Sequence, residues 1–141
     1  MIKPTKNRPI ALTIAGSDSG GGAGIQADLK TFHSFGVFGT SAITAITAQN
    51  TKSVLAVEVS NHLMIRSQID AVCHDLYPDA TKTGMLANTK GVRSVVDGVR
   101  TWNLAPLVVD PVMVATSGDR LLDPTSIDVM RSELLPLCLL Y

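Results

Sequence analysis

The sequence predicts an α/β fold, with a mostly parallel sheet flanked by helices on both faces and one domain over residues 1–141. Two observations carry this prediction. Short apolar runs alternate with segments in which apolar residues recur every three or four positions, the spacing of one helix face. Strands separated by helices of this length need crossover connections, which join parallel strands. Residues 1–141 contain no internal repeat, low-complexity tract or linker that would divide this domain.

The strand candidates are short runs rich in Val, Ile, Leu, Thr and Ala. They fall at residues 10–15, 41–49, 54–59, 80–86, 107–109 and 137–141. The run at 107–109 lies between Pro106 and Asp110 and is typical of a strand covered on both faces. Because the last run ends with the sequence, we expect a fold truncated on its C-terminal side, with an unpaired sheet edge near Leu137 that invites association.

Four segments show an apolar face at helical spacing. These faces comprise Ile25, Leu29 and Phe32; Ile65, Ile69, Val72, Cys73 and Leu76; Val92, Val95, Val96, Val99 and Trp102; and Ile127, Met130 and Leu134. Gly36 and Pro78 are expected to end the first two helices. Asn88 or Thr89 is expected to begin the third, and the pair Asp123-Pro124 the fourth.

Composition disfavours several classes of protein. The 12 basic and 12 acidic residues cancel, so nothing indicates a nucleic-acid partner or an anionic membrane surface. The basic N-terminus is followed by only six apolar-leaning residues, too few for a signal peptide, and no run approaches a membrane span. Cys73 and Cys138 lie far apart and outside any Cys-x-x-Cys pair, which favours a reducing, cytoplasmic setting over a disulfide or zinc framework.

The residues with unusual chemistry follow the predicted strands. A parallel α/β sheet binds its ligands at the carboxyl ends of the strands. At those ends lie a glycine-rich loop at residues 16–24, a polar segment at 49–51, Gly84-Met85, and Asp110-Pro111-Val112-Met113 followed by residues 116–119. The agreement of several strand ends on one rim predicts a binding site there.

The glycine-rich loop fits neither of two common phosphate-binding motifs. Residues 22–27 match G-x-G-x-x-A, but no acidic residue lies between Asp28 and Glu58 to hold a ribose. Gly22 stands where a P-loop needs lysine. Five glycines in nine residues exceed what a turn requires, and they predict close approach of a flat ligand to exposed backbone N–H groups.

Four ordered motifs resemble the hydroxymethylpyrimidine/phosphomethylpyrimidine kinases of thiamine biosynthesis. They are residues 11–28, 47–51, 82–86 and 109–113, and the resemblance runs over essentially all of residues 10–136. It implies a ribokinase-like fold and the N-terminal portion of an enzyme that uses ATP and Mg²⁺. The implied reaction phosphorylates 4-amino-5-hydroxymethyl-2-methylpyrimidine and then its monophosphate, in a protein expected to be a homodimer at full length.

By the same resemblance, the pyrimidine pocket would be lined by Gly16, Asp28, Gln49, Met85 and Val112. The Gln49 amide can accept from an exocyclic amine and donate to a ring nitrogen. Met85 and Val112 offer apolar surfaces to a flat ring. Asp110 would lie near the phosphates and Mg²⁺. Gln49 bonded to loop backbone, Asp28 as a surface carboxylate and Met85 as a core residue are the plainer alternatives.

The resemblance leaves the catalytic base unassigned. Family members carry an Asn-x-x-Glu motif and a glycine-rich anion hole with a Cys or Asp base in a C-terminal half that residues 1–141 lack. No catalytic residue and no metal ligand is therefore predicted here, and we expect these 141 residues to be an incomplete chain, inactive alone. A pyridoxal-type kinase of the same superfamily and a non-catalytic pyrimidine-binding remnant remain the alternatives.

Overall fold

The computed structural model describes residues 8–113, 118, 122 and 124–141. Its main sheet has four strands in the order β2-β1-β5-β6, and every neighbouring pair is parallel. These strands are β1 (Ile10–Ala15), β2 (Phe38–Ile43), β5 (Ala80–Thr83) and β6 (Leu107–Val109). A separate sheet pairs β3 (Ala45–Gln49) with β4 (Val54–Val59) in antiparallel register.

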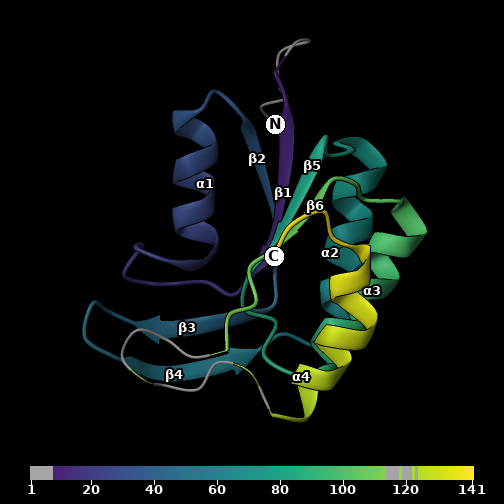
Figure 1. Cartoon of the computed structure of the whole chain (residues 1–141). Coiled ribbons are helices and arrows are strands. Elements are labelled where there is room, and N and C mark those ends of the chain that lie inside the picture. Colours follow the sequence, from purple (N-terminus) through teal and green to yellow (C-terminus); the bar gives the residue numbers. More distant parts are fainter. Residues whose placement is uncertain (1–7, 114–117, 119–121, 123) are drawn as a thin grey trace.

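Helices lie on both faces of the main sheet, which confirms the predicted fold class (Figure 1). Helix α1 (Gly24–Ser34) packs against β1 and β2 on one face, and α2 (His62–Asp75) and α3 (Thr89–Trp102) lie on the other. The short helix α4 (Thr125–Val129) packs on α3 and continues as a π-helical turn over Met130–Leu134 and a 3-10 turn over Leu135–Leu137. None of the helices in the described ranges is both long and apolar enough to cross a membrane.

The boundaries of α2 and α3 follow from their capping residues. Asn61 and Asn88 each accept a hydrogen bond from a backbone N–H in the first turn, at 2.9 Å from Leu63 and 2.9 Å from Gly91. The prediction that Asn88 or Thr89 begins the third helix is confirmed. Helix α3 ends at Asn103, whose φ of 50° is the left-handed conformation that closes many helices.

The hydrophobic core lies between the sheet and the pair α2–α3. Leu12 and Ile14 of β1 point to this face together with Leu107 and Val109 of β6, and all four are almost fully buried. They meet the predicted apolar faces of the two helices, including Ile65, Ile69, Cys73, Val92, Val95, Val96 and Val99. Packing of aliphatic side chains, with the partly buried Trp102 against them, therefore stabilises this layer.

The predicted strand at residues 41–49 is two strands in two different sheets. Composition alone gives one continuous β run, but the chain leaves the main sheet at Thr44. The Thr44 N–H donates to the Ala15 carbonyl at 3.0 Å, and its hydroxyl donates to the Met85 carbonyl at 2.5 Å. The following residues then pair with residues 54–59, so the predicted third strand is real but lies outside the parallel sheet.

Two further boundaries differ from the sequence prediction. The strand predicted at 80–86 ends at Thr83; Gly84 and Met85 then line the pocket, and Leu86 is buried in the hydrophobic core. At the C-terminus the chain forms a 3-10 turn through Leu137, and then one parallel bridge joins Leu140 to Val108. Residues 139 and 140 thus bond to the outer edge of β6, and the strand predicted at 137–141 is reduced to this bridge. Asp123, the predicted cap of the fourth helix, lies outside the described residues.

Candidate functional site

A cavity of about 240 Å³ opens at the carboxyl ends of β1, β3, β5 and β6. All six residues that the sequence analysis placed in or beside a pyrimidine site line it: Gly16, Asp28, Gln49, Met85, Asp110 and Val112. The same cavity is lined by Ser17, Asp18, Ala23, Gly24, Ala27, Lys82 and Gly84. Residues as distant in the sequence as Gly16 and Val112 therefore meet at one site, as the topology of a parallel sheet requires.

The glycine-rich loop wraps around a carboxylate. Asp18 is only 5% exposed, and its side chain accepts hydrogen bonds from the N–H groups of Gly20, Gly22 and Ala23 at 2.7 to 2.9 Å. The Gly21 N–H donates to the Asp18 carbonyl at 2.9 Å. The prediction that these N–H groups are presented to a ligand is therefore wrong, because an internal anion already accepts from them.

Two glycines lie where the pocket wall is closely packed, and at Gly24 the backbone conformation itself requires glycine. A Cβ at Gly16 would collide with the terminal methyl group of Met85, so glycine here lets the Met85 side chain lie against β1. Gly24 has a φ of +55°, and a Cβ there would collide with the Gly16 carbonyl oxygen. The loop thus folds back onto the start of α1, where the Ile25 N–H donates to that same carbonyl at 3.0 Å.

Hydroxyl groups join the glycine-rich loop to β3. Ser17 Oγ accepts from the Thr47 N–H at 3.0 Å, and Thr47 Oγ1 donates to the Ser17 carbonyl at 2.9 Å. Ser19 repeats the pattern with the backbone of Gln49, donating to its carbonyl at 2.6 Å and accepting from its N–H at 2.7 Å. The Gln49 backbone is therefore fixed, and its side-chain amide makes no hydrogen bond to another described residue, so it is available to a ligand.

The pocket floor carries a network of charged groups on the α1 face of the sheet. Asp28 of α1 accepts from the buried Thr13 hydroxyl at 2.6 Å. The Lys82 ammonium donates to both oxygens of Asp28, at 3.0 and 3.1 Å. Lys82 also forms an ion pair with Asp110 at 3.5 Å, and Asp110 is about half exposed at the edge of the pocket. Asp28 is thus engaged rather than a free surface carboxylate.

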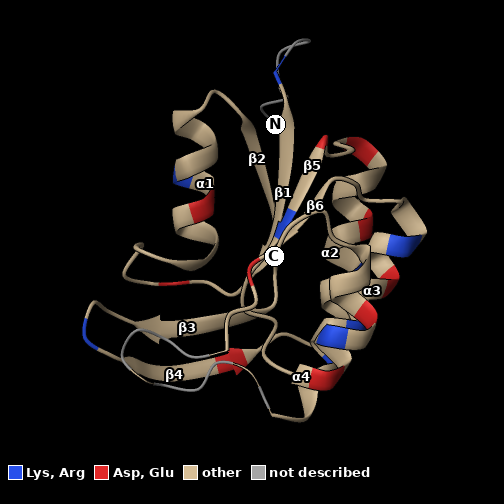
Figure 2. Ribbon diagram, in the orientation of Figure 1, with Lys and Arg blue, Asp and Glu red and all other residues tan. Residues whose placement is uncertain are grey.

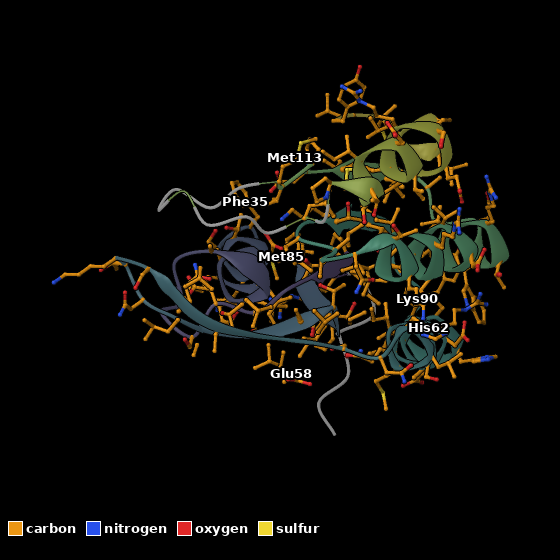
Figure 3. All side chains as sticks on the ribbon, turned by 90° about the horizontal axis from the view of Figure 1, so that it is seen from below. Phe35, Glu58, His62, Met85, Lys90 and Met113 are labelled. Carbon is orange, nitrogen blue, oxygen red and sulfur yellow. The ribbon has the colours of Figure 1, made fainter. Side chains whose placement is uncertain are left out.

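Apolar groups form the remaining walls. Met85 is 8% exposed, and Figure 3 shows it in the interior of the molecule, whereas Glu58 of β4 points outward. Val112 follows Asp110 across the pocket and is half-buried. An amide, two apolar walls and a charged floor can bind a flat heterocycle that has polar atoms along one edge.

The histidines and cysteines take no part in this site. His33, His62 and His74 are exposed, and none lines the pocket. Burial, followed by the negative charge of Asp70, raises the pKa of the Cys73 thiol to about 11, so it stays protonated at neutral pH. Cys73 and Cys138 are both free. Across the described residues, no three His, Cys, Asp or Glu side chains are arranged to hold a metal ion.

Sequence reasoning missed the roles of Lys82 and Asp18. Lys82 was noted only within a motif, although an ionisable residue between buried threonines and before a glycine is a signal. Such a lysine must find a carboxylate or face a cavity, because a buried charge is costly without a partner. The capping role of Asp18 depends on the loop conformation, and the spacing of the glycines alone does not reveal it.

The parallel sheet with helices on both faces and a pocket at its strand ends has the ribokinase-like fold. The family model described as phosphomethylpyrimidine kinase matches residues 18–141, and the chain belongs to this family. A hydroxymethylpyrimidine/phosphomethylpyrimidine kinase of Rhizobium meliloti (strain 1021) is 56% identical over 130 residues, which are 92% of this chain and 48% of that protein. The chain spans about half the length of most of the curated relatives it matches, and 23% of one from Schizosaccharomyces pombe.

Solved structures agree with this assignment. The crystal structure of a phosphomethylpyrimidine kinase from Clostridium difficile 630 is 50% identical and superposes with a TM-score of 0.87, over 93% of this chain and 57% of that one. A Bacillus subtilis pyridoxal kinase in complex with ADP is 38% identical with a TM-score of 0.82, over 94% of this chain and 50% of that one. The ribokinase-like fold predicted from the sequence is thereby confirmed.

Proposed function

We propose that this chain forms the substrate-binding part of an ATP-dependent kinase that phosphorylates hydroxymethylpyrimidine and then its monophosphate in thiamine biosynthesis. One observation carries the proposal: Gly16, Asp28, Gln49, Met85 and Val112 line a single cavity at the carboxyl ends of the strands. These are the residues that the resemblance assigns to the pyrimidine pocket. The family of the chain and the names of its relatives point to the same substrates.

The chemistry of the pocket suits an aminopyrimidine. The Gln49 head group offers one acceptor and two donors, which match an exocyclic amine beside a ring nitrogen. The Gln49 backbone is held by hydrogen bonds to the Ser19 hydroxyl at 2.6 and 2.7 Å, so ligand binding needs little ordering of this backbone segment. Met85 and Val112 contribute apolar contact to the ring faces.

Two features support a nucleotide and Mg²⁺ as cosubstrate and cofactor. A structure of the pyridoxal kinase from Staphylococcus aureus, 35% identical to this chain, is described in complex with AMP-PCP. Asp110 presents a half-exposed carboxylate at the pocket edge, an oxygen ligand of the kind that Mg²⁺ prefers. One carboxylate suffices in this role, because Mg²⁺ at phosphate sites takes its other ligands from phosphates and water. Mg²⁺ would supply charge neutralisation of the phosphates.

The 141 residues alone are proposed to bind the pyrimidine without transferring phosphate. The sequence contains no Asn-x-x-Glu motif and no second glycine-rich loop with a Cys or Asp base. Phosphoryl transfer requires positioned charges around the phosphate and a base at the nucleophile. Formation of the monophosphate by the pure chain with ATP and Mg²⁺ would contradict this part of the proposal.

Binding calorimetry tests the pyrimidine assignment. Hydroxymethylpyrimidine is expected to bind more tightly than pyridoxal, and Gln49→Ala is expected to weaken it about tenfold to hundredfold through the loss of ring-edge hydrogen bonds. Lys52→Ala, in the exposed turn between β3 and β4, is the control and should leave the affinity unchanged. A preference for pyridoxal would favour the pyridoxal-type kinase suggested by the similar solved structures, and binding of neither ligand would overturn the proposal.

The remaining expectations concern the oligomeric state and the cellular location of the complete protein. We propose a cytoplasmic homodimer, supported by apolar side chains that lie exposed on the β3–β4 sheet, namely Ile46, Leu55, Val57 and Val59. The register sets Ile46 opposite Glu58 on one face, and Val57 and Val59 opposite Thr47 and Ala45 on the other, so each face of this sheet exposes apolar side chains that a second copy could cover. Sedimentation equilibrium on the complete gene product checks it, and a monomer at micromolar concentration would rule the homodimer out. A non-catalytic remnant would bind the pyrimidine with no effect of ATP in that same product.

A further inference from the structure

The pocket holds one positive charge among several negative ones. Of the described residues that line it, Asp18, Asp28 and Asp110 carry carboxylates, and Lys82 is the only lysine or arginine. Figure 2 shows a blue segment on β5 within a main sheet that is otherwise almost entirely tan. A neutral alcohol enters such a pocket without difficulty. A phosphate monoester carries a charge between −1 and −2 near neutral pH and needs a cationic partner there.

The backbone of the glycine-rich loop does not supply this partner. The N–H groups of Gly20, Gly22 and Ala23 donate to the Asp18 carboxylate, and that of Gly21 to the Asp18 carbonyl. At the start of α1 the Ile25 N–H donates to the Gly16 carbonyl. These N–H groups are therefore already engaged within the chain, unlike those of the phosphate-binding loops that the glycine content suggests.

Lys82 has the spare capacity that the loop lacks. The Lys82 ammonium group has three N–H donors. Two of them are used by the two carboxylate oxygens of Asp28, at 3.0 and 3.1 Å. Asp110 lies at 3.5 Å from the same nitrogen and accepts no hydrogen bond from it. The third donor consequently has only a weak partner at the open edge of the pocket. The Lys82 side chain is 24% exposed, so an incoming anion can reach it.

We propose that Lys82 is the specificity-determining residue that lets this pocket accept a phosphorylated pyrimidine as well as the alcohol, by donating to the phosphate oxygens in place of Asp110. The proposal rests on the pyrimidine-binding function proposed above. Asp28, fixed by the Thr13 hydroxyl at 2.6 Å, holds the lysine in position while the phosphate displaces the weaker pair. The flexible stem of lysine permits the small shift of its ammonium group that this exchange needs.

The test compares two ligands in the 141-residue chain by calorimetry, without nucleotide or metal. Lys82→Gln removes the charge but keeps N–H donors for Asp28. It is expected to raise the Kd of hydroxymethylpyrimidine monophosphate about tenfold to hundredfold, and that of the alcohol by less than about threefold. Lys90→Gln, an exposed lysine on α3 outside the pocket, is the matched control and should change neither value.

The ratio of the two affinities separates the possible outcomes. If the variant weakens both ligands equally, Lys82 only maintains the pocket and the inference falls, while the pyrimidine-binding function stands. If the wild-type chain binds the alcohol but not the monophosphate, the inference likewise falls alone. If the wild-type chain binds neither, the proposed function fails and takes the inference with it.

A second measurement needs no variant and so does not depend on its folding. The second ionisation of a phosphate monoester has a pKa of about 6. If Lys82 is its partner, the affinity of the monophosphate relative to that of the alcohol should rise from about pH 5 to 7.5 as the dianion forms, because the ring is common to both ligands. Asp18, Asp28 and Asp110 are the other charged groups that face the ligand. If the affinity of the monophosphate falls relative to that of the alcohol at the higher pH, repulsion by these carboxylates outweighs attraction by Lys82, and the inference is overturned.

Discussion

The two faces of the four-stranded sheet have opposite chemistry. On the α2–α3 face, Leu12 and Ile14 of β1 lie beside their register partners Thr81 and Thr83 of β5, and all four are buried. On the α1 face, the register sets Thr13 beside Lys82, and both contact the Asp28 carboxylate. A shift of one residue along the same strand thus separates the core from the site. The stability of the fold resides on one face, and its recognition chemistry on the other.

Truncation of a core residue should have the largest effect on stability. Ile14→Ala removes a fully buried side chain between the sheet and α2–α3. The lost burial and the cavity left behind are expected to lower the free energy of unfolding by about 2–5 kcal/mol. Chemical denaturation measures this loss. A loss below about 1 kcal/mol would mean that the α2–α3 face is not the main source of stability.

A matched pair of threonines compares the two faces directly. Thr13 and Thr83 are both fully buried, but only Thr13 has a partner, the Asp28 carboxylate at 2.6 Å. Thr83 Oγ1 has no hydrogen-bond partner in the described part of the chain. Thr13→Val is therefore expected to cost about 1.5–3 kcal/mol, and Thr83→Val to be neutral or stabilising by up to about 1 kcal/mol. Equal losses in urea denaturation would contradict the distinction between the faces.

The smallest effect concerns acid stability on the outer side of the α2–α3 layer. Burial raises the pKa of Asp70, but hydrogen bonds from Trp102 and Arg66 outweigh it and hold the pKa below its ordinary value of 3.8. A lowered pKa in the folded state contributes stability above pH 3.8 that is lost as the pH falls through the folded-state value. Asp70→Asn should therefore be less stable than the wild type at pH 6, and the gap should narrow toward pH 3. A gap independent of pH would contradict the assignment.

The sequence predicted those elements whose signals are local. The apolar spacing of Val92, Val95, Val96 and Val99 identified α3, and Asn88 marked its start. The prediction of one strand at residues 41–49 was wrong because the break at Thr44 depends on its hydrogen bonds to Ala15 and Met85, which are distant in sequence. Periodicity reports on burial along one element, and it does not reveal a tertiary contact that redirects the chain.

The site residues divide in the same way, into those that sequence signals identify and those whose roles depend on contacts between distant residues. Gly16, Gln49, Met85 and Val112 were found from their place at strand ends and from the family resemblance, and the structure brings them into one cavity. The use of the loop N–H groups was predicted wrongly, because glycine spacing cannot show that Asp18 accepts from them. The coupling of Lys82 to Asp28 was not foreseen, since it spans 54 residues and depends on the register of β1 against β5.

Methyl NMR during a titration with hydroxymethylpyrimidine tests the central claim, that the pyrimidine binds at the carboxyl ends of the strands. The methyl groups of Met85 and Val112 line the pocket, whereas those of Ile65 and Ile69 lie on the α2–α3 face. Saturable shifts at Met85 and Val112, with Ile65 and Ile69 unchanged, are the predicted result. Shifts confined to Ile65 and Ile69, or no saturable shift at Met85 and Val112, would contradict the account.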